Sequence, residues 1–191
     1  MKQVGIFSGS FNPIHIGHLA LANYLCEFEQ LDEVWFLVTP HNPLKERTSL
    51  MDDVLRFQFV KQATAGYAPF KASDFEFHLP QPSYTIDTLN ALSKAYPFHQ
   101  FHLIVGADNW LTFDKWKDYQ TLITNYPIFV YPRHGYDLPT VSAYDSVRFV
   151  GAPIIEISST FIRESILAGK DVRFFLPPSI YDSCCSALKS K

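Results

Sequence analysis

Apolar and polar positions along the chain fall into blocks that predict strands separated by helices. Short apolar runs bounded by Gly, Pro or polar residues are typical of buried strands. Such runs occupy residues 4–7, 33–38, 101–105, 127–131, 147–150 and 154–157, and residues 70–77 combine a partial alternation with an exit loop. Because helix-forming stretches separate most of these runs, we expect an α/β fold: a doubly wound, mostly parallel sheet flanked by helices, of the Rossmann-like type.

Caps and the spacing of apolar residues indicate where the helices begin. Thr48 and Ser49 offer a cap for a helix over residues 50–65, whose apolar positions recur at helical spacing and are expected to face the core. Those positions are Leu50, Val54, Phe57 and Val60. Ser83 or Thr85 can cap a second helix further along the chain.

Size and composition limit the classes of function. With 191 residues, 47% of them hydrophobic, the chain is expected to form one globular domain spanning residues 1–191. A net charge of −3 gives no electrostatic footprint for nonspecific nucleic-acid binding. No apolar run of about 18 residues and no signal peptide are evident, so we expect no membrane association. The composition leaves open whether the chain is a monomer or a homo-oligomer.

The three cysteines indicate the compartment. Cys26, Cys184 and Cys185 have neither the spacing of a disulfide framework nor that of a metal site. Reduced thiols and a cytoplasmic location are therefore favoured.

The strongest chemical signal lies in residues 9–18, which read GSFNPIHIGH. They follow a predicted strand and lead into a run of helix formers, so they occupy a turn at the carboxyl edge of the sheet, where ligands bind. The free N–H groups and the positive dipole end of the helix favour an anion there. His15 and His18 can donate hydrogen bonds to phosphate oxygens, and Gly17 lets a ligand approach the backbone closely.

The two histidines also have less specific interpretations. A single histidine is more often structural, and a close pair can hold a metal ion. Metal-binding pairs on one helix usually stand four residues apart, whereas these stand three apart, and no third ligand is evident nearby. The GSFNP sequence that precedes the pair favours a nucleotide site.

Polar residues follow other predicted strands at the same edge. Lys45 lies in a Pro-broken loop after the second strand and can reach toward the histidines, although most surface lysines are only solvated charges. Asp108 follows the strand at 101–105 and can accept from ribose hydroxyls, hold a metal ion or cap the next helix. A turn at residues 133–135 follows the strand at 127–131.

Further candidates lie near helix starts. Residues 83–85 can receive a carboxylate or phosphate through their N–H groups, or they can simply cap the helix. Trp116 can stack on an aromatic ring or pack in the core. Residues 158–163, SSTFIR, begin a helix with Arg163 one turn in, where a guanidinium can form bidentate pairs with phosphate oxygens.

These motifs together closely resemble those of the bacterial nicotinate-nucleotide adenylyltransferases, in the H-x-G-H nucleotidyltransferase superfamily. Residues 9–18 look like the family's G-S-F-[DN]-P-x-H-x-G-H, and residues 157–163 look like its I-S-S-T-x-I-R. Residues 82–89 are similar to P-S-Y-T-x-D-T-L, and residues 106–108 with Trp116 are similar to the G-A-D…W segment. The resemblance covers nearly the whole chain, and the four motifs occur in the family's order.

The resemblance implies transfer of AMP from ATP to nicotinate mononucleotide, with release of pyrophosphate and formation of nicotinate adenine dinucleotide. Its implied catalytic residues are His15, His18 and Arg163. Implied ATP contacts are Gly9, Ser10, Phe11, His15, His18, Gly106, Asp108, Ile157, Ser159, Thr160 and Arg163. Implied contacts of nicotinate mononucleotide are Lys45, Ser83, Tyr84, Thr85, Trp116 and Lys117. Mg²⁺ would enter bound to ATP, without metal ligands from the protein.

Two segments depart from the family pattern. Residues 41–45 read HNPLK where many members have P-P-H-K, so only Lys45 carries over. The pair Cys184-Cys185 stands near a C-terminus that is aromatic or aliphatic in many members.

Four alternative activities share features with this sequence. The letters HIGH also occur in class I aminoacyl-tRNA synthetases, but those need a much longer chain and a K-M-S-K-S loop, which this sequence lacks. Phosphopantetheine adenylyltransferases have T-x-G-H in place of His15 and lack residues 83–85. Nicotinamide mononucleotide is the nearest alternative acceptor, although a receptor of N–H groups disfavours a carboxamide NH₂. The last alternative is a nucleotide-binding sensor without catalysis.

Overall fold

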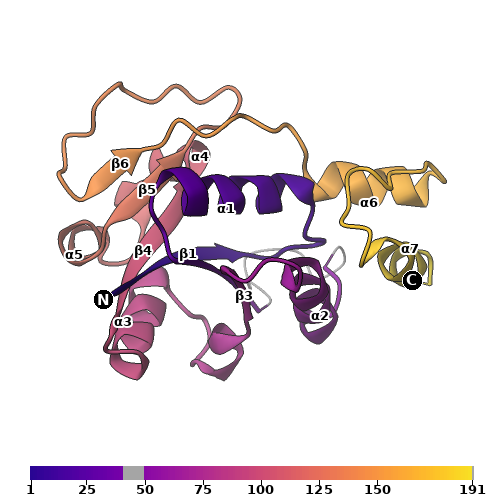
Figure 1. The fold of residues 1–191 in the computed structure, drawn as a ribbon, viewed down its shortest axis with the longest axis horizontal. Helices are drawn as coiled ribbons and strands as arrows, with labels where there is room; N and C mark the ends of the chain where they lie inside the picture. The colour runs from indigo at the N-terminus through magenta and orange to yellow at the C-terminus, as the bar shows by residue number, and fades with distance from the viewer. Residues whose placement is uncertain (41–49, 191) are drawn as a thin grey trace.

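The computed structural model describes residues 1–40 and 50–190, which form a six-stranded parallel sheet with helices on both faces (Figure 1). The strands are β1 (Lys2–Gly9), β2 (Glu33–Val38), β3 (Phe70–Ser73), β4 (His99–Gly106), β5 (Ile128–Tyr131) and β6 (Val147–Phe149). The α-helices are α1 (Ile16–Phe28), α2 (Asp53–Thr64), α3 (Thr85–Ala95), α4 (Ala107–Trp110), α5 (Tyr119–Asn125), α6 (Ser159–Leu167) and α7 (Tyr181–Lys189). Two short 3-10 helices are η2 (Phe75–His78) and η3 (Phe113–Lys115). The predicted doubly wound, parallel α/β fold is confirmed.

Alternate residues of the central strands build two hydrophobic cores, one on each face of the sheet. In β2, where every residue is buried, Val34 and Phe36 join the core under α1, α2, α6 and α7. Trp35 and Leu37 join the core under α3 and α5. Figure 1 shows α1 above the sheet and α3 below it. The near-continuous apolar runs of the sequence reflect this burial on both sides.

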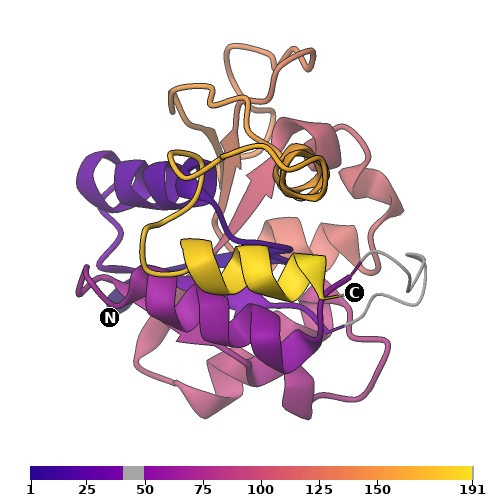
Figure 2. The ribbon, with the colours of Figure 1, turned by 90° about the vertical axis from the view of Figure 1, so that its right-hand side faces the viewer.

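The C-terminal helices complete the first core at the edge of the sheet. Figure 2 shows α7 alongside α2, and Ser179 Oγ donates to the carbonyl of Gln62 at 3.3 Å. Cys184 and Leu188 are buried in the same cluster as Phe59 of α2. The cysteine of the unusual C-terminal segment is therefore a packing residue.

The order of the strands places a ligand crevice. The order is β3-β2-β1-β4-β5-β6. After β1, the chain adds β2 and β3 on one side of that strand and then β4, β5 and β6 on its other side, so the order of the strands switches between β1 and β4. In open parallel sheets, ligands bind outside the carboxyl ends of the strands at such a switch point. The carboxyl ends of these two strands are Gly9 and Gly106, the glycines of two of the sequence motifs.

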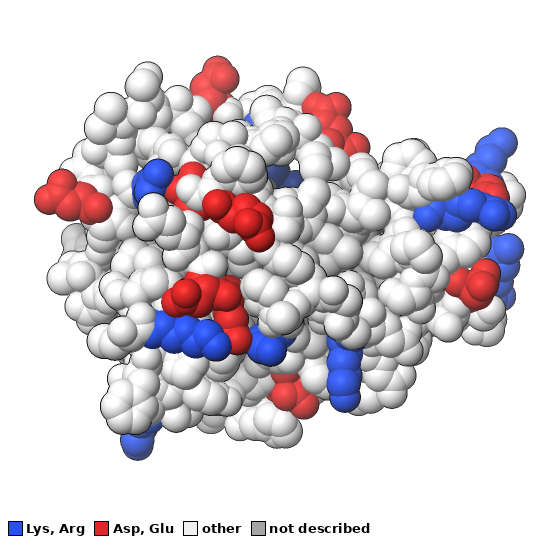
Figure 3. Space-filling model, in the orientation of Figure 1, with Lys and Arg blue, Asp and Glu red and all other residues white. Residues whose placement is uncertain are grey.

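Surface charge agrees with the composition. On the face drawn in Figure 3, basic and acidic side chains are interspersed, without the basic stripe that binds nucleic acids. Within residues 1–40 and 50–190, none of the helices is long and apolar enough to cross a membrane.

The strand predicted at 154–157 is wrong. This segment is an extended connection between β6 and α6, and it pairs with none of the sheet's strands. Ile154 and Ile155 are 53% and 39% exposed, so burial in a sheet does not explain why these two positions are apolar. They line a cavity instead.

The predicted start and buried stripe of the helix at 50–65 are wrong in part. The helix α2 begins at Asp53, and the side chain of Asp52 caps it by accepting from Val54 N at 3.0 Å and Leu55 N at 3.2 Å. Thr48 and Ser49 lie outside the described residues, as does Lys45. Val54 is exposed. The residues of α2 that are buried are Arg56, Phe59, Val60 and Thr64.

A buried carboxyl beneath α3 predicts a pH dependence of stability. Glu76 is 5% exposed, and its Oε1 accepts from Thr88 Oγ1 at 3.0 Å. Burial raises the pKa of Glu76 to about 7. The unfolded chain loses this proton near pH 4.5 and the folded chain near pH 7, so this group makes the protein less stable as the pH rises between those values. We expect Glu76→Gln to remove this loss.

The measurement is urea unfolding of wild type and Glu76→Gln at pH 5, 6, 7 and 8. The difference in unfolding free energy should grow in favour of the variant by up to about 3 kcal/mol across this range. The exposed Glu164→Gln serves as the matched control, and its difference should vary much less with pH than that of Glu76→Gln. A flat difference for Glu76→Gln would mean that this carboxyl titrates normally.

Candidate active site

The turn between β1 and α1 is held by hydrogen bonds from α2, from residue 51 and from α6. The carbonyl of Ser10 accepts from Arg56 Nη1. Asn12 Oδ1 accepts from the backbone N–H of Met51 at 3.0 Å, and the carbonyl of Asn12 accepts from Arg163 Nη1 at 2.7 Å. The turn is therefore fixed in position before any ligand binds.

The motif that begins α6 lies directly against this turn. Ser159 Oγ donates to the carbonyl of Pro13 at 2.9 Å. Arg163, besides its bond to the turn, donates from Nη2 to Thr160 Oγ1 at 3.2 Å. Ser158 caps α6, since its side chain accepts a backbone N–H of the first turn. The two motifs, far apart in sequence, therefore form one structure.

The two histidines of the first motif stack on each other. His15 is the N-cap residue of α1, and its backbone N–H donates to Nδ1 of His18 at 3.2 Å. The two rings lie 3.7 Å apart at an interplanar angle of 26°. A Cβ atom on Gly17 would lie 3.1 Å from His15 Nδ1, so a side chain there would push against the stacked ring. Because Nδ1 of His18 accepts a hydrogen bond, its neutral ring carries the proton on Nε2.

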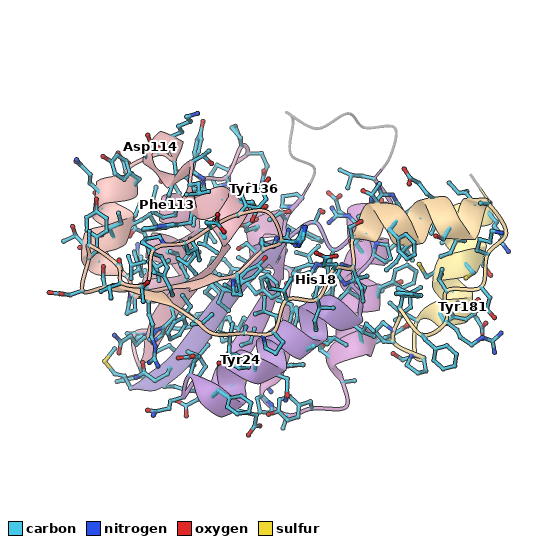
Figure 4. The ribbon with its side chains drawn as sticks, turned by 90° about the horizontal axis from the view of Figure 1, so that it is seen from above. His18, Tyr24, Phe113, Asp114, Tyr136 and Tyr181 are labelled. Carbon is cyan, nitrogen blue, oxygen red and sulfur yellow. The ribbon has the colours of Figure 1, made fainter. Side chains whose placement is uncertain are left out.

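Both imidazoles are neutral at pH 7. Burial, with a smaller effect of the Arg133 charge, lowers the pKa of His15 to about 4. Burial, then His15 and Arg133, hold the pKa of His18 well below its usual value. The pair therefore offers N–H donors rather than fixed positive charges, and Figure 4 shows His18 near the middle of the molecule.

A cavity of about 580 Å³ opens at the switch point beside these rings. Four segments line it: β1 at Phe7, the start of α1, the exit of β5 at residues 131–136, and residues 153–158 with Phe161. Asp108 of α4 adds a carboxylate. A cavity of this size, with apolar walls and a few convergent polar groups, is typical of a small-molecule site.

The predicted ATP contacts divide into two groups in the structure. His15, His18, Asp108 and Ile157 line the cavity. The others lie at the end of β1, in the turn after it, at the end of β4 and in the first turns of α6. These are Gly9, Ser10, Phe11, Gly106, Ser159, Thr160 and Arg163.

The carboxylate of Asp108 lies close to the backbone of Gly106. Gly106 is the N-cap residue of α4, so Asp108 lies inside this helix and is not its cap. A Cβ atom on Gly106 would lie 2.4 Å from Asp108 Oδ1, closer than any side chain allows. Gly106 thus permits the position of the carboxylate in the cavity wall.

Sequence reasoning missed most of the wall formed after β5. Tyr131, Arg133, His134 and Tyr136 line the cavity, and Arg133 Nε lies 3.4 Å from Asp108 Oδ1. The available signal was their place at the carboxyl end of a predicted strand. Figure 4 shows Tyr136 above and to the left of His18 when the fold is seen from above, and both line the cavity.

The residues predicted for the second substrate form a separate group. Lys117 Nζ pairs with Asp87 of α3 at 2.9 Å and lies 4.6 Å from the centre of the Tyr84 ring. Trp116 is partly exposed and packs against Phe113, 4.8 Å between ring centres. The structure thus brings the start of α3 and the segment after η3 together. Of the members of this group that the structure describes, none lines the cavity described above.

The cap predicted for α3 is wrong. Tyr84 is the N-cap residue, and its side chain makes no capping hydrogen bond. Ser83 and Thr85 are both partly exposed. A helix start without a side-chain cap keeps its backbone N–H groups for another partner.

A parallel sheet of this order, with stacked H-x-G-H histidines and a carboxylate around a cavity at its switch point, defines a nucleotide-binding α/β domain of the nucleotidyltransferase class. The family model that matches the sequence is "Cytidylyltransferase-like", over residues 6–165. The chain is also 58% identical to the "Probable nicotinate-nucleotide adenylyltransferase" of Bacteroides fragilis, over 94% of this chain and 89% of that one. The corresponding protein of Flavobacterium johnsoniae is 47% identical, over 94% of each chain. This chain belongs to the nicotinate-nucleotide adenylyltransferases of the cytidylyltransferase-like family.

Solved structures show the same fold at lower sequence identity. The nicotinic acid mononucleotide adenylyltransferase of Plasmodium falciparum, complexed with NaAD, superposes with a TM-score of 0.80 at 16% identity. The match covers 100% of this chain and 96% of that chain. A putative nicotinate-nucleotide adenylyltransferase of Vibrio parahaemolyticus has a TM-score of 0.69 at 20% identity, covering 100% and 93% of the two chains.

Proposed function

We propose that this protein transfers AMP from ATP to nicotinate mononucleotide, forming nicotinate adenine dinucleotide and pyrophosphate. The observation that carries this proposal is the stacked pair His15–His18. These two neutral imidazoles follow the turn between β1 and α1 and line the cavity at the switch point. The family to which the chain belongs supports the choice of substrates. We also propose the cytoplasm as the place of reaction, in keeping with the free thiols of all three cysteines.

The reaction needs no covalent enzyme intermediate. A phosphate oxygen of the mononucleotide attacks the α-phosphorus of ATP, the bond from that phosphorus to the bridging oxygen breaks, and pyrophosphate leaves. Such transfers depend on positioning and on charge stabilisation. The Nε2–H of His18 is a donor for the negative charge that develops on the reacting oxygens.

Each predicted ATP group has a place in this scheme. Arg163 and the first turn of α6 would grip the phosphates, since they lie against the turn after β1. Asp108 would accept from ribose hydroxyls. Within the part of the chain that the structure describes, there is no cluster of three or more metal-ligating side chains. Mg²⁺ would enter with ATP, held mainly by its phosphates and by water, as part of the substrate.

The nicotinate end would bind near the start of α3. Free N–H groups and the positive end of a helix dipole suit a carboxylate at Thr85. The partly exposed indole of Trp116 would stack on the pyridine ring. Lys117, paired with Asp87 of α3, lies beside the start of that helix and adds positive charge nearby.

Pyrophosphate release tests the proposal. Purified protein receives ATP and Mg²⁺ with nicotinate mononucleotide, with nicotinamide mononucleotide or with phosphopantetheine, and a reaction without acceptor is the control. We expect turnover with the acid and a strong preference for it over the amide. Equal or reversed rates would contradict the carboxylate receptor at Thr85. ATP binding without turnover on any acceptor would indicate the sensor instead.

A further inference from the structure

One cation in the cavity wall has no role in the reaction scheme above. Arg133 follows β5, and its side chain lines the cavity and is 47% exposed. Its Nε lies 3.4 Å from Asp108 Oδ1, and the centre of its guanidinium lies 5.7 Å from the centre of the Tyr131 ring. The backbone behind it is fixed by a turn, in which Tyr136 N–H donates to the carbonyl of Arg133 at 3.2 Å.

The distribution of charge around the cavity makes Arg133 a candidate for binding an anionic ligand. Among the described residues that line the cavity, Arg133 is the one lysine or arginine, whereas Asp108 and Glu156 contribute carboxylates. Arg133 lines the same cavity as both imidazoles, and its charge lowers the pKa of His15 and of His18. With neutral histidines, a polyanionic nucleotide that enters the cavity meets one permanent positive charge there.

The interaction of Arg133 with Asp108 is weak enough to be replaced when a ligand binds. A half-exposed ion pair that joins one nitrogen to one oxygen at 3.4 Å is weak. The carboxylate that holds it is Asp108, the group proposed to accept from the ribose. Binding of the ribose would thus take the carboxylate away from the guanidinium at the moment when phosphates arrive. A guanidinium suits this exchange, since it binds phosphate oxygens in bidentate pairs.

We propose that Arg133 is a substrate-binding residue, which moves its hydrogen bonds from Asp108 to the phosphate groups of ATP. This inference rests on the proposed function, because it takes ATP as the ligand of the cavity. It assigns to the turn after β5 a part in nucleotide binding alongside the H-x-G-H turn and α6. Arg163 is held by Asn12 and Thr160, so the two arginines approach the nucleotide from different elements.

The chain offers a closely matched control. Arg173, in the segment between α6 and α7, pairs with Asp171 at 2.6 Å, and its guanidinium lies 5.7 Å from the centre of the Tyr181 ring. It therefore has the same kinds of partner as Arg133, an aspartate and a tyrosine. Figure 4 shows Tyr181 at the far end of the molecule from His18.

The experiment compares wild type, Arg133→Gln, Arg133→Lys and Arg173→Gln. ATP affinity is measured by calorimetry with MgATP in the absence of acceptor, and KM and kcat are measured by pyrophosphate release. We expect Arg133→Gln to weaken ATP binding and raise the KM for ATP by about 10-fold or more, with a much smaller change in the KM for the mononucleotide. Arg133→Lys should keep part of the affinity, and Arg173→Gln should match wild type.

Two results are kept apart by this design. If wild type binds ATP and Arg133→Gln binds it equally well, the role of Arg133 is refuted while the proposed function stands. If wild type does not bind ATP, the proposed function itself fails. A uniform loss in which kcat falls and both KM values stay unchanged would also contradict a binding role for Arg133.

Discussion

Replacing His18 by alanine is expected to lower kcat for pyrophosphate release by at least about 100-fold, the scale for removing one donor that stabilises developing negative charge. The hydrogen bond from His15 N–H to Nδ1 fixes the donor at Nε2, and alanine removes that donor altogether. Stability should change little, by about 1 kcal/mol, since the side chain lies at the cavity wall and gives up one hydrogen bond. Turnover assays and urea unfolding on the same preparation measure both effects.

Two further variants make the His18 prediction specific. His18→Asn keeps an N–H donor on a shorter side chain and should recover part of the activity. His78→Ala removes an exposed imidazole from η2, outside the cavity, and should leave turnover unchanged. A His18→Ala protein that is unfolded, or one that is fully active, would refute the assignment.

The strands and their connections could be predicted because burial on two faces leaves a plain signal. In β2 every residue is apolar except Glu33 at its start, and no helix pattern fits so short a run. The turn after β1 could be predicted for a related reason. Pro13 limits the backbone conformations that the chain can adopt there, whereas Gly9 and Gly17 widen them. Such local constraints are written in the residue types themselves.

The wall of the cavity could not be predicted in the same way. Ile154 and Ile155 are apolar because they line a cavity, and a short apolar run there has the same pattern as a strand. The proposed role of Arg133 depends on the adjacent positions of β4 and β5 in the sheet. This pairing brings Arg133 next to Asp108, although the two residues are 25 positions apart in the sequence. Sequence position alone does not give that contact.

The buried face of α2 is a second failure with a physical reason. Sequence patterns treat arginine as a polar, exposed residue, so Arg56 was not counted among the inward positions. The structure has Arg56 fully buried, with Nε donating to the carbonyl of Met51 at 3.2 Å and Nη2 to the carbonyl of Thr39 at 2.9 Å. Burial of a guanidinium is tolerated when nearly all its donors are used, and that requires carbonyls from segments distant in sequence.

Arg56 consequently joins the ends of two strands. Its Nη1 donates to the carbonyl of Ser10 in the turn after β1, while Thr39 follows directly on β2. Asp53 of the same helix pairs with Nη2 at 2.6 Å, which balances the charge. A single side chain therefore links α2 with both loops at the carboxyl edge.

Arg56→Met is expected to lower the free energy of unfolding by about 3–5 kcal/mol, since it leaves three carbonyls without their donor, each at a cost of about 1–3 kcal/mol, and removes an ion-pair partner of the partly exposed Asp53. That is a large part of the 5–15 kcal/mol typical of a domain. Urea unfolding measures it, with the exposed Arg173→Met as a control that should stay within about 0.5 kcal/mol of wild type. If Arg56→Met does not fold, Arg56→Lys should still fold, with an intermediate loss in the free energy of unfolding. Lysine keeps the positive charge but lacks the several N–H donors of the guanidinium. An Arg56→Met protein as stable as wild type would show that these carbonyls find other donors and that the link between the two loops is not needed for the fold.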